Sequence, residues 1–508
     1  MESPNFKPTF FQSIFIKLFK IVNSTIPWSN LPGFIGAINL DFLRIDLRNY
    51  NLHDGYASAD AQGKVGEQPP VEERFIGTRN SDGKDNSLEM RRMGCAGMRF
   101  GRNFNRKYCQ KPTDEELLTP NPRLVSQTFM ARETHEFKPA TTLNLLAAAW
   151  IQFQVHDWFN HEDDDTTFDI PLSPEDDWQG KRMSLFKTKT DMELHPSDQL
   201  CPGYRNVNTA WWDGSQIYGS SEVVTGELRS KNQDGKLHLD RIGIQPFFIP
   251  RNGDGTPKTG FSDNCDQIFD KARIVNCALM AKIHTVEWTP AILAHPALQI
   301  GMSANWWGIV GEKLTKAVGR ISKTSEAISG IPGSGVDHQG IPYSLTEEFV
   351  SVYRMHSLVP VRDRERGVPR YTTFRRLLRM DVPKTFEELT GGNIELAQKL
   401  SKVYDGDIDK VDTLVGSHSE PVPPGFGFSD TAFRIFILMA SRRLKSDRFI
   451  AGSWNADMYT KEGFQWVQDT NMSDVLCRHF PELGQVIPKK TNIFAPWTRT
   501  LPSKDRGL

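Results

Sequence analysis

The sequence lacks the features that mark disulfide-stapled, zinc-binding and membrane-spanning proteins. Its six cysteines are scattered along 508 residues with no CxxC pair, which argues against a disulfide framework or a zinc ribbon and favours a reducing, intracellular compartment. No stretch approaches the roughly 18 consecutive apolar residues of a spanning helix. The apolar start of the chain has no small-residue cleavage site, which disfavours a secretory signal.

The chain also lacks an excess of either charge. It carries 61 Lys and Arg against 62 Asp and Glu, a net charge of −1, so nothing suggests nucleic acid or a strongly acidic partner. With 38% hydrophobic and 24% charged residues, the composition is that of a soluble globular protein. The length allows about two to four domains or one large helical enzyme domain, and we expect a monomer.

Three segments differ in character. Residues 1–50 contain an apolar stretch that predicts a helix, which either docks on the protein or touches a membrane or lipid body as an interfacial helix. The apolar side of this helix is formed by Phe11, Ile14, Phe15, Leu18, Phe19 and Val22. Residues 51–127, rich in Gly, Pro, Asn and charge, predict an irregular arm. From residue 128 to 508 the pattern is mainly helical.

Two long helices are expected in the first half of this third segment. The stretch TTLNLLAAAWIQFQVHDWF predicts a buried central helix that follows a cap at Thr141 or Thr142 and runs to about Phe159. The second helix covers roughly residues 268–293, and Pro290 should kink or end it because proline lacks a backbone N–H.

Two further helices are expected towards the end of the chain. Ser344 and Glu347 are spaced as a capping box, so a helix should begin there and run through His356. Another should follow a cap at Ser429 or Asp430. Strand patterns are few and short. The fold class is therefore expected to be mostly α.

Polar residues in the apolar central helix are the first candidates for chemistry. Gln152 and His156 lie four residues apart and so project from one face. An unpaired buried polar group costs on the order of 1–3 kcal/mol, so both side chains need partners. The simpler interpretation is a core histidine whose hydrogen bonds are made within the protein. The more specific interpretation is a histidine that binds a ligand.

A second candidate is the loop sequence NTAWWDGSQIYGS. Thr209, Asp213 and Ser215 present oxygen atoms at alternating positions, and Asp157 can add a carboxylate from the end of the central helix. Hydroxyl, carboxylate and carbonyl oxygens are the ligands that calcium prefers. Spacing alone fits a plain turn equally well.

A third candidate is the pair Tyr353 and His356, three residues apart on one face of an expected helix. A neutral histidine near a helix end can ligate haem iron, and a nearby tyrosine can donate one electron. Packing of two core residues is the alternative.

Together these stretches resemble a known family. The chain is similar to the fatty-acid alpha-dioxygenases of the peroxidase–cyclooxygenase superfamily. The similarity rests on LNLLAAAWIQFQVHDW (143–158), TAWWDGSQIYGS (209–220), AKIHTVEWT (281–289), PYSLTEEFVSVYRMHSL (342–358), RDRERGVPRYTTFRR (362–376) and MASRRLKSDRF (439–449). These motifs follow the family's order over nearly everything after residue 121.

The resemblance implies a helical haem peroxidase/cyclooxygenase-like domain over residues 128–508 that binds haem b. It makes His356 the proximal iron ligand, His156 the distal histidine and Gln152 the neighbour of that histidine. It makes Tyr353 the catalytic residue, which forms a radical and abstracts hydrogen from the substrate. The implied reaction inserts O2 at C-2 of a long-chain fatty acid and yields a 2-hydroperoxy acid, a step of oxylipin formation.

The resemblance also implies two binding sites. Asp157, Thr209, Trp211 (through its carbonyl), Asp213 and Ser215 match a structural calcium site. His284, Thr289 and Arg443 match the residues that hold the fatty-acid carboxylate, and charge-assisted hydrogen bonds suit that task. A surface arginine after an apolar helix is the alternative for Arg443.

Two regions are shorter than the family pattern. One lies between about residues 241 and 270, and in the other only residues 357–361 separate His356 from Arg362. Five residues span at most about 16–18 Å. Two other functions therefore stay open: a haem peroxidase with a different reductant, and a catalytically inactive homologue that has lost part of its haem support.

Overall fold

Helices make up most of the described residues, and the mostly α fold class is confirmed. The computed structural model describes residues 6–53, 70–131, 142–191, 201, 203–229, 265–339, 341, 343–354, 360–487 and 492–497. Within these residues the strands β1 (Asp163–Pro171) and β2 (Arg182–Thr188) form an antiparallel hairpin, with Thr167 opposite Phe186.

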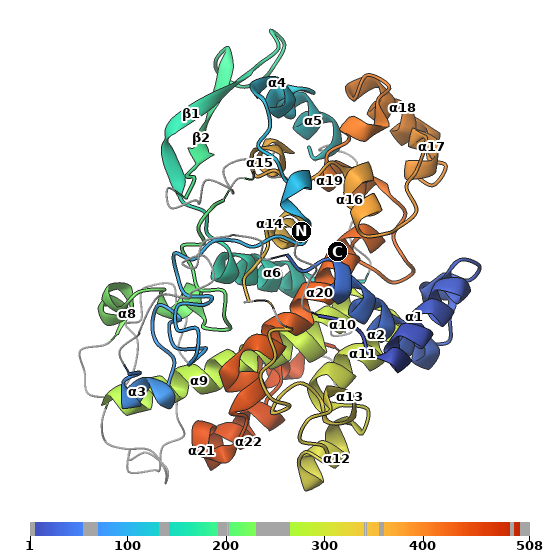
Figure 1. The fold of residues 1–508 in the computed structure, drawn as a ribbon. Helices are drawn as coiled ribbons and strands as arrows, with labels where there is room; N and C mark the ends of the chain where they lie inside the picture. Colours follow the sequence, from blue (N-terminus) through green and yellow to red (C-terminus); the bar gives the residue numbers. More distant parts are fainter. Residues whose placement is uncertain are drawn as a thin grey trace, which may run out of the picture.

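The helices form two groups with α6 and α14 between them (Figure 1). The upper group lies beside the β1–β2 hairpin and contains α4 (Asp114–Leu118), α5 (Pro122–Phe129), α15 (Pro360–Glu365), α16 (Tyr371–Leu377), α17 (Phe386–Leu389), α18 (Ile394–Val403) and α19 (Thr413–Ser419). The lower group contains α1 (Phe10–Asn23), α2 (Gly33–Tyr50), α9 (Cys265–Ile283), α10 (Thr289–Ile292), α11 (Pro296–Trp307), α12 (Gly311–Val318), α13 (Glu326–Ser329), α20 (Asp430–Ser446), α21 (Ala456–Tyr459), α22 (Lys461–Asp469) and α23 (Met472–His479). Between them lie α6 (Leu145–Trp158) and α14 (Glu347–Arg354). Helix α3 (Glu73–Ile76) lies beside the start of α9, where Arg74 pairs with Asp270, and α8 (Glu222–Leu228) lies above it on the same side. Helix α7 (Ser215–Tyr218) packs against α6.

The largest hydrophobic core forms where α6, α9, α11, α14 and α20 meet, and a separate smaller core holds the upper group together. The large core includes Trp158, Trp288, Phe349 and Phe436, all almost completely buried. Aromatic side chains bury the most area per residue, so they dominate the stability of such a core.

The central helix α6 begins later than predicted. Its N-cap is Asn144, whose side-chain oxygen accepts from the backbone N–H of Ala147, so the predicted cap at Thr142 is wrong, and Thr141 lies outside the described residues. The backbone N–H of Asn144 also donates to the carbonyl of Phe494 at 3.0 Å. This tertiary contact holds Asn144 in an extended conformation and delays the start of the helix.

The second predicted helix is interrupted just before its proline. Helix α9 passes into a π-helical turn, η5 (His284–Trp288), and continues as the short helix α10 to Ile292. In the π-turn the N–H of Thr289 donates to the carbonyl of His284, five residues earlier. Pro290 follows directly and cannot donate a hydrogen bond, which confirms the predicted irregularity.

Helix α14 also begins later than predicted. The described helix starts at Glu347, and the hydroxyl of Thr346 accepts from the N–H of Phe349 at 3.2 Å, so the predicted capping box of Ser344 and Glu347 is wrong. Thr346 forms a parallel bridge with Gly101, which keeps it extended up to the first helical residue. Helix α14 is described to Arg354.

Helix α20 begins as predicted. The hydroxyl of Ser429 accepts from the N–H of Ala432 at 3.1 Å, which confirms the predicted cap. Phe433 and Phe436 on this helix are buried in the large core, and Arg443 lies near its end.

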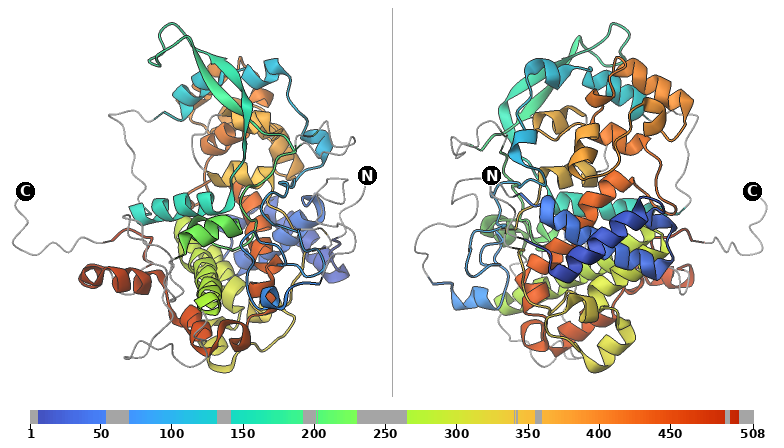
Figure 2. Two further views of the ribbon diagram at one scale, coloured as in Figure 1. Left: turned by 90° about the vertical axis from the view of Figure 1, so that its left-hand side faces the viewer. Right: turned by 45° about the vertical axis from the view of Figure 1, so that its right-hand side comes forward.

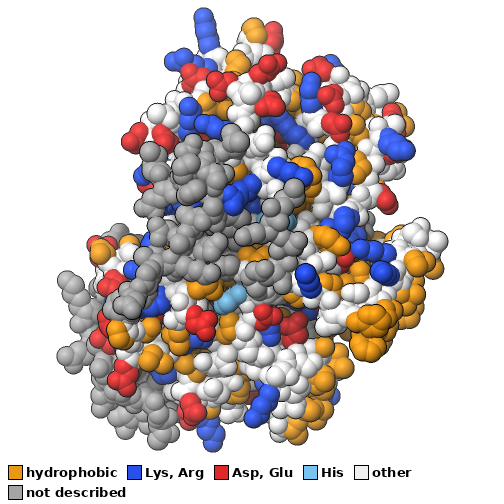
Figure 3. Space-filling view, in the orientation of Figure 1, with side chains coloured by type: hydrophobic (Ala, Val, Ile, Leu, Met, Phe, Trp, Pro, Cys, Tyr) orange, Lys and Arg blue, Asp and Glu red, His pale blue; other side chains and the backbone are white. Residues whose placement is uncertain are grey.

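Helices α1 and α2 form a hairpin that lies across one side of the body, while the β1–β2 hairpin projects at the top (Figure 2). The two helices join through the stacked rings of Phe15 and Phe42, and α2 packs on α11 and α20. Figure 3 shows hydrophobic side chains gathered over α1. No helix among the described residues is long and apolar enough to cross a membrane. The division into segments 1–50, 51–127 and 128–508 stays a prediction.

Candidate active site

A chain of hydrogen bonds at the centre of the large core joins three helical elements. Nε2 of His284 in the π-turn lies 2.7 Å from the hydroxyl of Tyr353 on α14. Nδ1 of the same imidazole accepts from the indole N–H of Trp150 on α6 at 3.1 Å. The structure thereby places the predicted radical tyrosine and a predicted substrate-binding residue in direct contact.

Burial keeps both His284 and Tyr353 neutral. Burial, and secondly the positive charge of Arg443, lower the pKa of His284 well below its ordinary value. Burial raises the pKa of the Tyr353 phenol well above its ordinary value, although Arg443 opposes this rise. Because the phenol stays protonated at neutral pH, its one-electron oxidation must also release a proton.

Arg443 is a buried cation, and one of its guanidinium nitrogens has no hydrogen-bond partner in the described structure. Its side chain is almost completely buried, with its guanidinium carbon 3.9 Å from the ring centre of Trp158 and 4.5 Å from that of Trp212. Nε donates to the hydroxyl of Tyr343, and Nη2 lies 3.4 Å from the carbonyl of Trp211. Nη1 has no hydrogen-bond partner in the described structure. A surface position for Arg443 is therefore wrong.

Within the described part of the chain, no carboxylate forms an ion pair with Arg443. A buried guanidinium without a counter-charge is costly unless an anion binds beside it. The arrangement can therefore accept a carboxylate through a charge-assisted hydrogen bond from Nη1.

Two neighbouring cavities lie in this part of the core. The smaller one, about 10 Å³, is lined by His284, Thr289, Tyr353 and Arg443 among others. The larger one, about 390 Å³, lies between α2, α11 and α20 and is mostly apolar. Both are lined by Met302, Asn305, Ala440 and Ser441, so the two cavities are neighbours that share these four residues. The volume of the larger one is within the usual range for small-molecule sites.

Thr289 lines the small cavity, but its hydroxyl is already used. It donates to the carbonyl of His284 at 2.7 Å, beside the i→i+5 bond of the π-turn. Thr289 therefore stabilises the turn that aims the imidazole of His284 at Tyr353. Its predicted contact with a carboxylate stays a prediction.

The predicted distal residues lie on an open face of α6. Nε2 of His156 is 2.8 Å from the amide nitrogen of Gln152, and both side chains are exposed. The other exposed residues of this face are Leu145, Ala148 and Ala149. Small and apolar side chains beside the pair leave room for a flat macrocycle against the helix, so this face fits haem. His356, the predicted proximal ligand, lies outside the described residues.

Three of the predicted calcium ligands have buried oxygens without partners. These atoms are Oδ2 of Asp157, Oγ1 of Thr209 and Oδ2 of Asp213. Burial raises the pKa of Asp157 to about 7, although the backbone N–H of Gln216 donates to its other oxygen. No cluster of three or more His, Cys, Asp or Glu side chains occurs among the described residues, so hydroxyl and carbonyl oxygens must complete any cation site here.

The other two predicted ligands have partners. The hydroxyl of Ser215 accepts from Ser220 at 2.9 Å, and the carbonyl of Trp211 faces Nη2 of Arg443. A carbonyl oxygen has two lone pairs and can serve two partners. The residues therefore fit a hard cation, with Trp211 shared between this site and the arginine.

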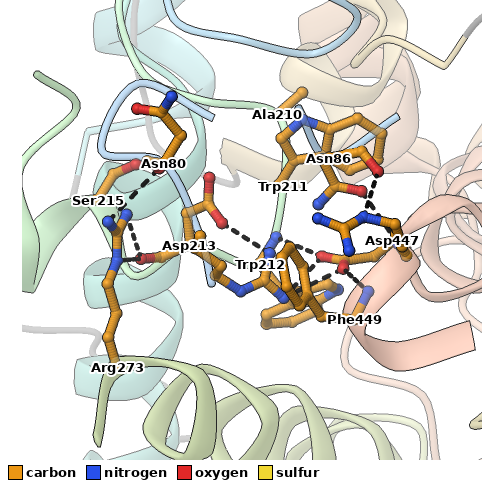
Figure 4. A network of polar contacts seen from close by, with 12 residues as sticks. Asn80, Asn86, Ala210, Trp211, Trp212, Asp213, Ser215, Arg273, Asp447 and Phe449 are labelled. Atoms are coloured by element: carbon orange, nitrogen blue, oxygen red, sulfur yellow. Dashed lines mark hydrogen bonds and ion pairs between the residues drawn. The ribbon is translucent and has the colours of Figure 1, made fainter. Parts of the chain in front are cut away.

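Arg79 ties the same loop to α20. Its Nη1 donates to Asp213 at 2.7 Å and its Nη2 donates to Asp447 at 3.0 Å, and all three side chains are buried. Figure 4 shows Asp213 and Asp447 in this network, with Arg273 reaching the backbone of Asp213 from α9. The loop that carries the predicted calcium ligands is thus held by Arg273 on α9 and, through Arg79, by Asp447 at the end of α20.

The sequence alone did not identify Trp150, Trp158, Trp212 or Arg79 as parts of the site. Trp150 lies on the predicted central helix, where an indole is expected only to pack, and Arg79 lies in the predicted irregular arm. Their partners are more than 100 residues away in the chain, so no local pattern could have found them.

The sequence and the fold are similar to those of known proteins. The sequence profile of the family described as animal haem peroxidase matches residues 78–265, 258–362 and 361–492. Alpha-dioxygenase PIOX of Oryza sativa subsp. japonica is 30% identical and covers 97% of this chain and 96% of its own length. This chain belongs to the animal haem peroxidase family, and within it to the alpha-dioxygenases. The family predicted from the motifs is confirmed, and with it the assignment as an oxidoreductase.

Two solved structures are also similar. The crystal structure of Oryza sativa fatty acid alpha-dioxygenase superimposes with a TM-score of 0.84 at 28% identity, covering 97% of this chain and 98% of that one. A tyrosine-to-phenylalanine variant of the rice protein, solved with palmitic acid, superimposes with a TM-score of 0.83 at 28% identity over the same shares.

The comparisons also locate the shortened regions. The profile matches in three pieces that meet near residues 258–265 and 361–362, the two places where the sequence departs from the family pattern. The alignment with the rice protein extends over 614 positions, more than the 508 residues of this chain, so the relative carries segments that are absent here.

The buried network around Arg79 should contribute to the stability of the fold. Arg79→Met leaves the carboxylates of Asp213 and Asp447 buried without their shared cation, and we expect the free energy of unfolding to fall by about 3–5 kcal/mol. Urea denaturation followed by circular dichroism measures this change. Lys399→Met, which removes an exposed pair with Glu395, should cost at most about 0.5 kcal/mol. Equal losses in the two variants would contradict the role of the network.

Proposed function

We propose that this protein inserts O2 at C-2 of long-chain fatty acids, using haem b as cofactor and a radical on Tyr353. The observation that carries the proposal is the small cavity in which the buried Tyr353 faces Arg443, whose Nη1 has no partner. The cavity as it stands has room for about one water molecule, so side chains between it and the larger groove, such as Met302, must move before a carboxylate bound to Nη1 can bring the carbon beside it close to Tyr353. Fixing the geometry of the two reacting groups supplies a large part of such a rate enhancement.

The larger groove suits the rest of the substrate. Its lining is mostly apolar, including Phe436, Ile437 and Ala440 of the stripe on α20 that the sequence suggested for an acyl chain. It shares four lining residues with the small cavity and reaches the exposed residues Phe34 and Ile309. In this proposal Arg443 holds the carboxylate from Nη1, while His284 and Thr289 line the cavity around it.

The proposed reaction begins with the radical of Tyr353 and regenerates it. The tyrosyl radical takes one hydrogen atom from C-2 of the fatty acid, which breaks a C–H bond and restores the phenol. Dioxygen then adds to the carbon radical, and the resulting peroxyl radical takes a hydrogen atom back from Tyr353. The product is a 2-hydroperoxy acid, which can decay to carbon dioxide, water and an aldehyde one carbon shorter.

Haem b, when bound, supplies the one-electron oxidising power that generates the first tyrosyl radical. His356 would hold the iron from the proximal side, and His156 with Gln152 would lie over the distal face. The open face of α6 supports this position. The side chains themselves contribute orientation and exclusion of water, because Tyr353, His284 and Arg443 are all buried.

We also propose that Asp157, Thr209, Asp213, Ser215 and the carbonyl of Trp211 bind calcium. The unpartnered oxygens of the first three residues support the site. Asp157 directly follows His156, and Asn208 donates to the carbonyl of His156 at 2.8 Å. A cation here would fix the end of α6 and with it the position of the distal histidine.

The exposed apolar side of α1 and α2 supports contact with a lipid surface such as a membrane or lipid body. The exposed side chains are Phe10, Phe11, Ile14, Phe15, Leu18, Ile21, Phe34, Ile35 and Ile38. Residues 6–40 contain three lysines and no acidic residue, which favours anionic lipids. Phe34 and Ile38 also line the larger groove, so fatty acid could enter where the protein meets the lipid.

Oxygen consumption with palmitic acid tests the proposed chemistry. Tyr353→Phe should retain haem but lose activity by about three orders of magnitude, because the radical cannot form. Arg443→Met should raise the KM about tenfold or more, since it removes a hydrogen bond to a charged group. The control Tyr459→Phe removes a buried hydroxyl that bonds the backbone elsewhere and should keep near-normal activity. Full activity of Tyr353→Phe would refute the radical role, and peroxide-driven dye oxidation without palmitate-dependent oxygen uptake would indicate a peroxidase.

Calcium removal tests the cation site. Addition of calcium to chelator-treated protein should raise the melting temperature, and Thr209→Val should abolish most of that rise because it removes one unpartnered oxygen. The control Thr225→Val removes a buried hydroxyl bonded to the carbonyl of Tyr218 and should keep the response. A calcium response that is unchanged in Thr209→Val would contradict the ligand set.

Co-sedimentation with vesicles tests the lipid surface. The double variant Phe10→Ser/Phe11→Ser should bind vesicles of anionic phospholipid about 100-fold more weakly, since each phenylalanine contributes at least about 1.5 kcal/mol when buried in lipid. Ile394→Ser, at an exposed apolar position in the upper helical group, should leave binding unchanged. Equal binding by all three proteins would show that α1 does not contact lipid.

A further inference from the structure

The indole N–H of Trp150 determines which nitrogen of His284 carries the proton. An indole N–H can only donate a hydrogen bond, so Nδ1 of His284 must be unprotonated to accept it at 3.1 Å. The ring is neutral in its buried position. A neutral imidazole has one proton, which therefore lies on Nε2, the nitrogen that faces Tyr353 at 2.7 Å.

This protonation has a direct consequence for the phenol. Nε2–H of His284 donates to the hydroxyl oxygen of Tyr353, so His284 cannot accept the phenolic hydrogen. Tyr353 has no other hydrogen-bond partner among the described residues, and Tyr353 and Arg443 both line the small cavity. The phenolic hydrogen must then point into that cavity, whose volume is about enough for one water molecule.

We propose that Trp150 is a positioning residue that holds His284 in the Nε2–H form and so directs the hydrogen of Tyr353 towards the substrate. The residue touches neither substrate nor cofactor in this account and acts through His284. The inference rests on the proposed function for its catalytic meaning, but the protonation of His284 follows from the geometry alone.

The proposal assigns the fate of the proton when Tyr353 is oxidised by one electron. The electron leaves towards the haem of the proposed function, and the phenolic proton passes to the carboxylate or water in the small cavity. His284 keeps its own proton and donates it as a hydrogen bond to the radical oxygen. Hydrogen exchange with C-2 and with the peroxyl group then takes place on the cavity side of the phenol.

Removal of the indole of Trp150 favours the other neutral form of His284, in which the proton lies on Nδ1. With Trp150→Phe, Nδ1 no longer receives a hydrogen bond, and the ring can carry its proton there instead. Nε2 is then free to accept from Tyr353, whose phenol is a better donor than a neutral imidazole. A hydrogen bond of ordinary strength shifts such an equilibrium by about tenfold.

The chain contains a matched control. Trp288 stacks on the same imidazole, with ring centres 4.7 Å apart, but its indole N–H donates to the carbonyl of Ala147 at 2.9 Å. Trp288→Phe therefore makes the same chemical change against the same ring without touching the hydrogen bond to Nδ1.

Nitrogen-15 NMR of the histidine rings measures the proton position directly. The full-length protein is labelled at its 12 histidines, and the His284 signals are assigned by their loss in His284→Gln. Haem-containing protein is studied in the diamagnetic ferrous carbon monoxide form, and protein without haem as purified. The signals can be read in either case, so a failure of the proposed haem function is distinguishable from a failure of this inference.

We expect the Nε2–H form in the wild type and in Trp288→Phe, and a shift of about tenfold towards the Nδ1–H form in Trp150→Phe. In active enzyme, Trp150→Phe should lower kcat about tenfold and leave the KM for palmitic acid within about twofold. An Nδ1–H or doubly protonated ring in the wild type overturns the proposal, even if Trp150→Phe does not fold. An unchanged His284 in folded Trp150→Phe overturns it as well.

Discussion

The hydrogen bond between Tyr353 and His284 requires α14 and the end of α9 to keep one mutual position inside the core. Its 2.7 Å length leaves little freedom, and the π-turn that carries His284 depends in turn on Thr289 and on the proline that follows. The aromatic rings of Trp158, Trp288 and Phe349 fill the space around both side chains. The core therefore fixes the orientation of this phenol beside one small cavity.

The site retains several buried polar atoms without partners. A buried polar atom costs on the order of 1–3 kcal/mol while it stays unpaired. The atoms concerned are Nη1 of Arg443 and one oxygen each of Asp157, Thr209 and Asp213. A carboxylate beside the arginine and a cation among the oxygens would remove these costs. Arg443 also contacts the carbonyl of Trp211, so the two proposed sites are mechanically linked through one loop.

Local patterns in the sequence predicted the helices, the cap at Ser429 and the oxygen-rich loop, because these features depend on neighbours in the chain. The family motifs identified Tyr353, His284 and Arg443. The cap at Thr346 and the late start of α6 could not be predicted, since contacts with Gly101 and Phe494 determine them. The same holds for Arg79, whose partner Asp447 is 368 residues away, and for the contact of Trp150 with His284.

The short connection between α14 and α15 is the most unusual feature of this alpha-dioxygenase. Ser351 on α14 donates to Asp363 on α15 at 2.7 Å, so the two helices are joined by a direct hydrogen bond in a chain that lacks the longer segment of the relatives. Everything proposed for Tyr353 depends on haem binding beside this connection. A haem titration of the purified chain, followed by absorption spectroscopy, tests this most directly. The account predicts an intense haem absorption band that saturates at about one haem per chain and is lost in His356→Ala. A folded, helical wild-type protein without such a band would contradict it.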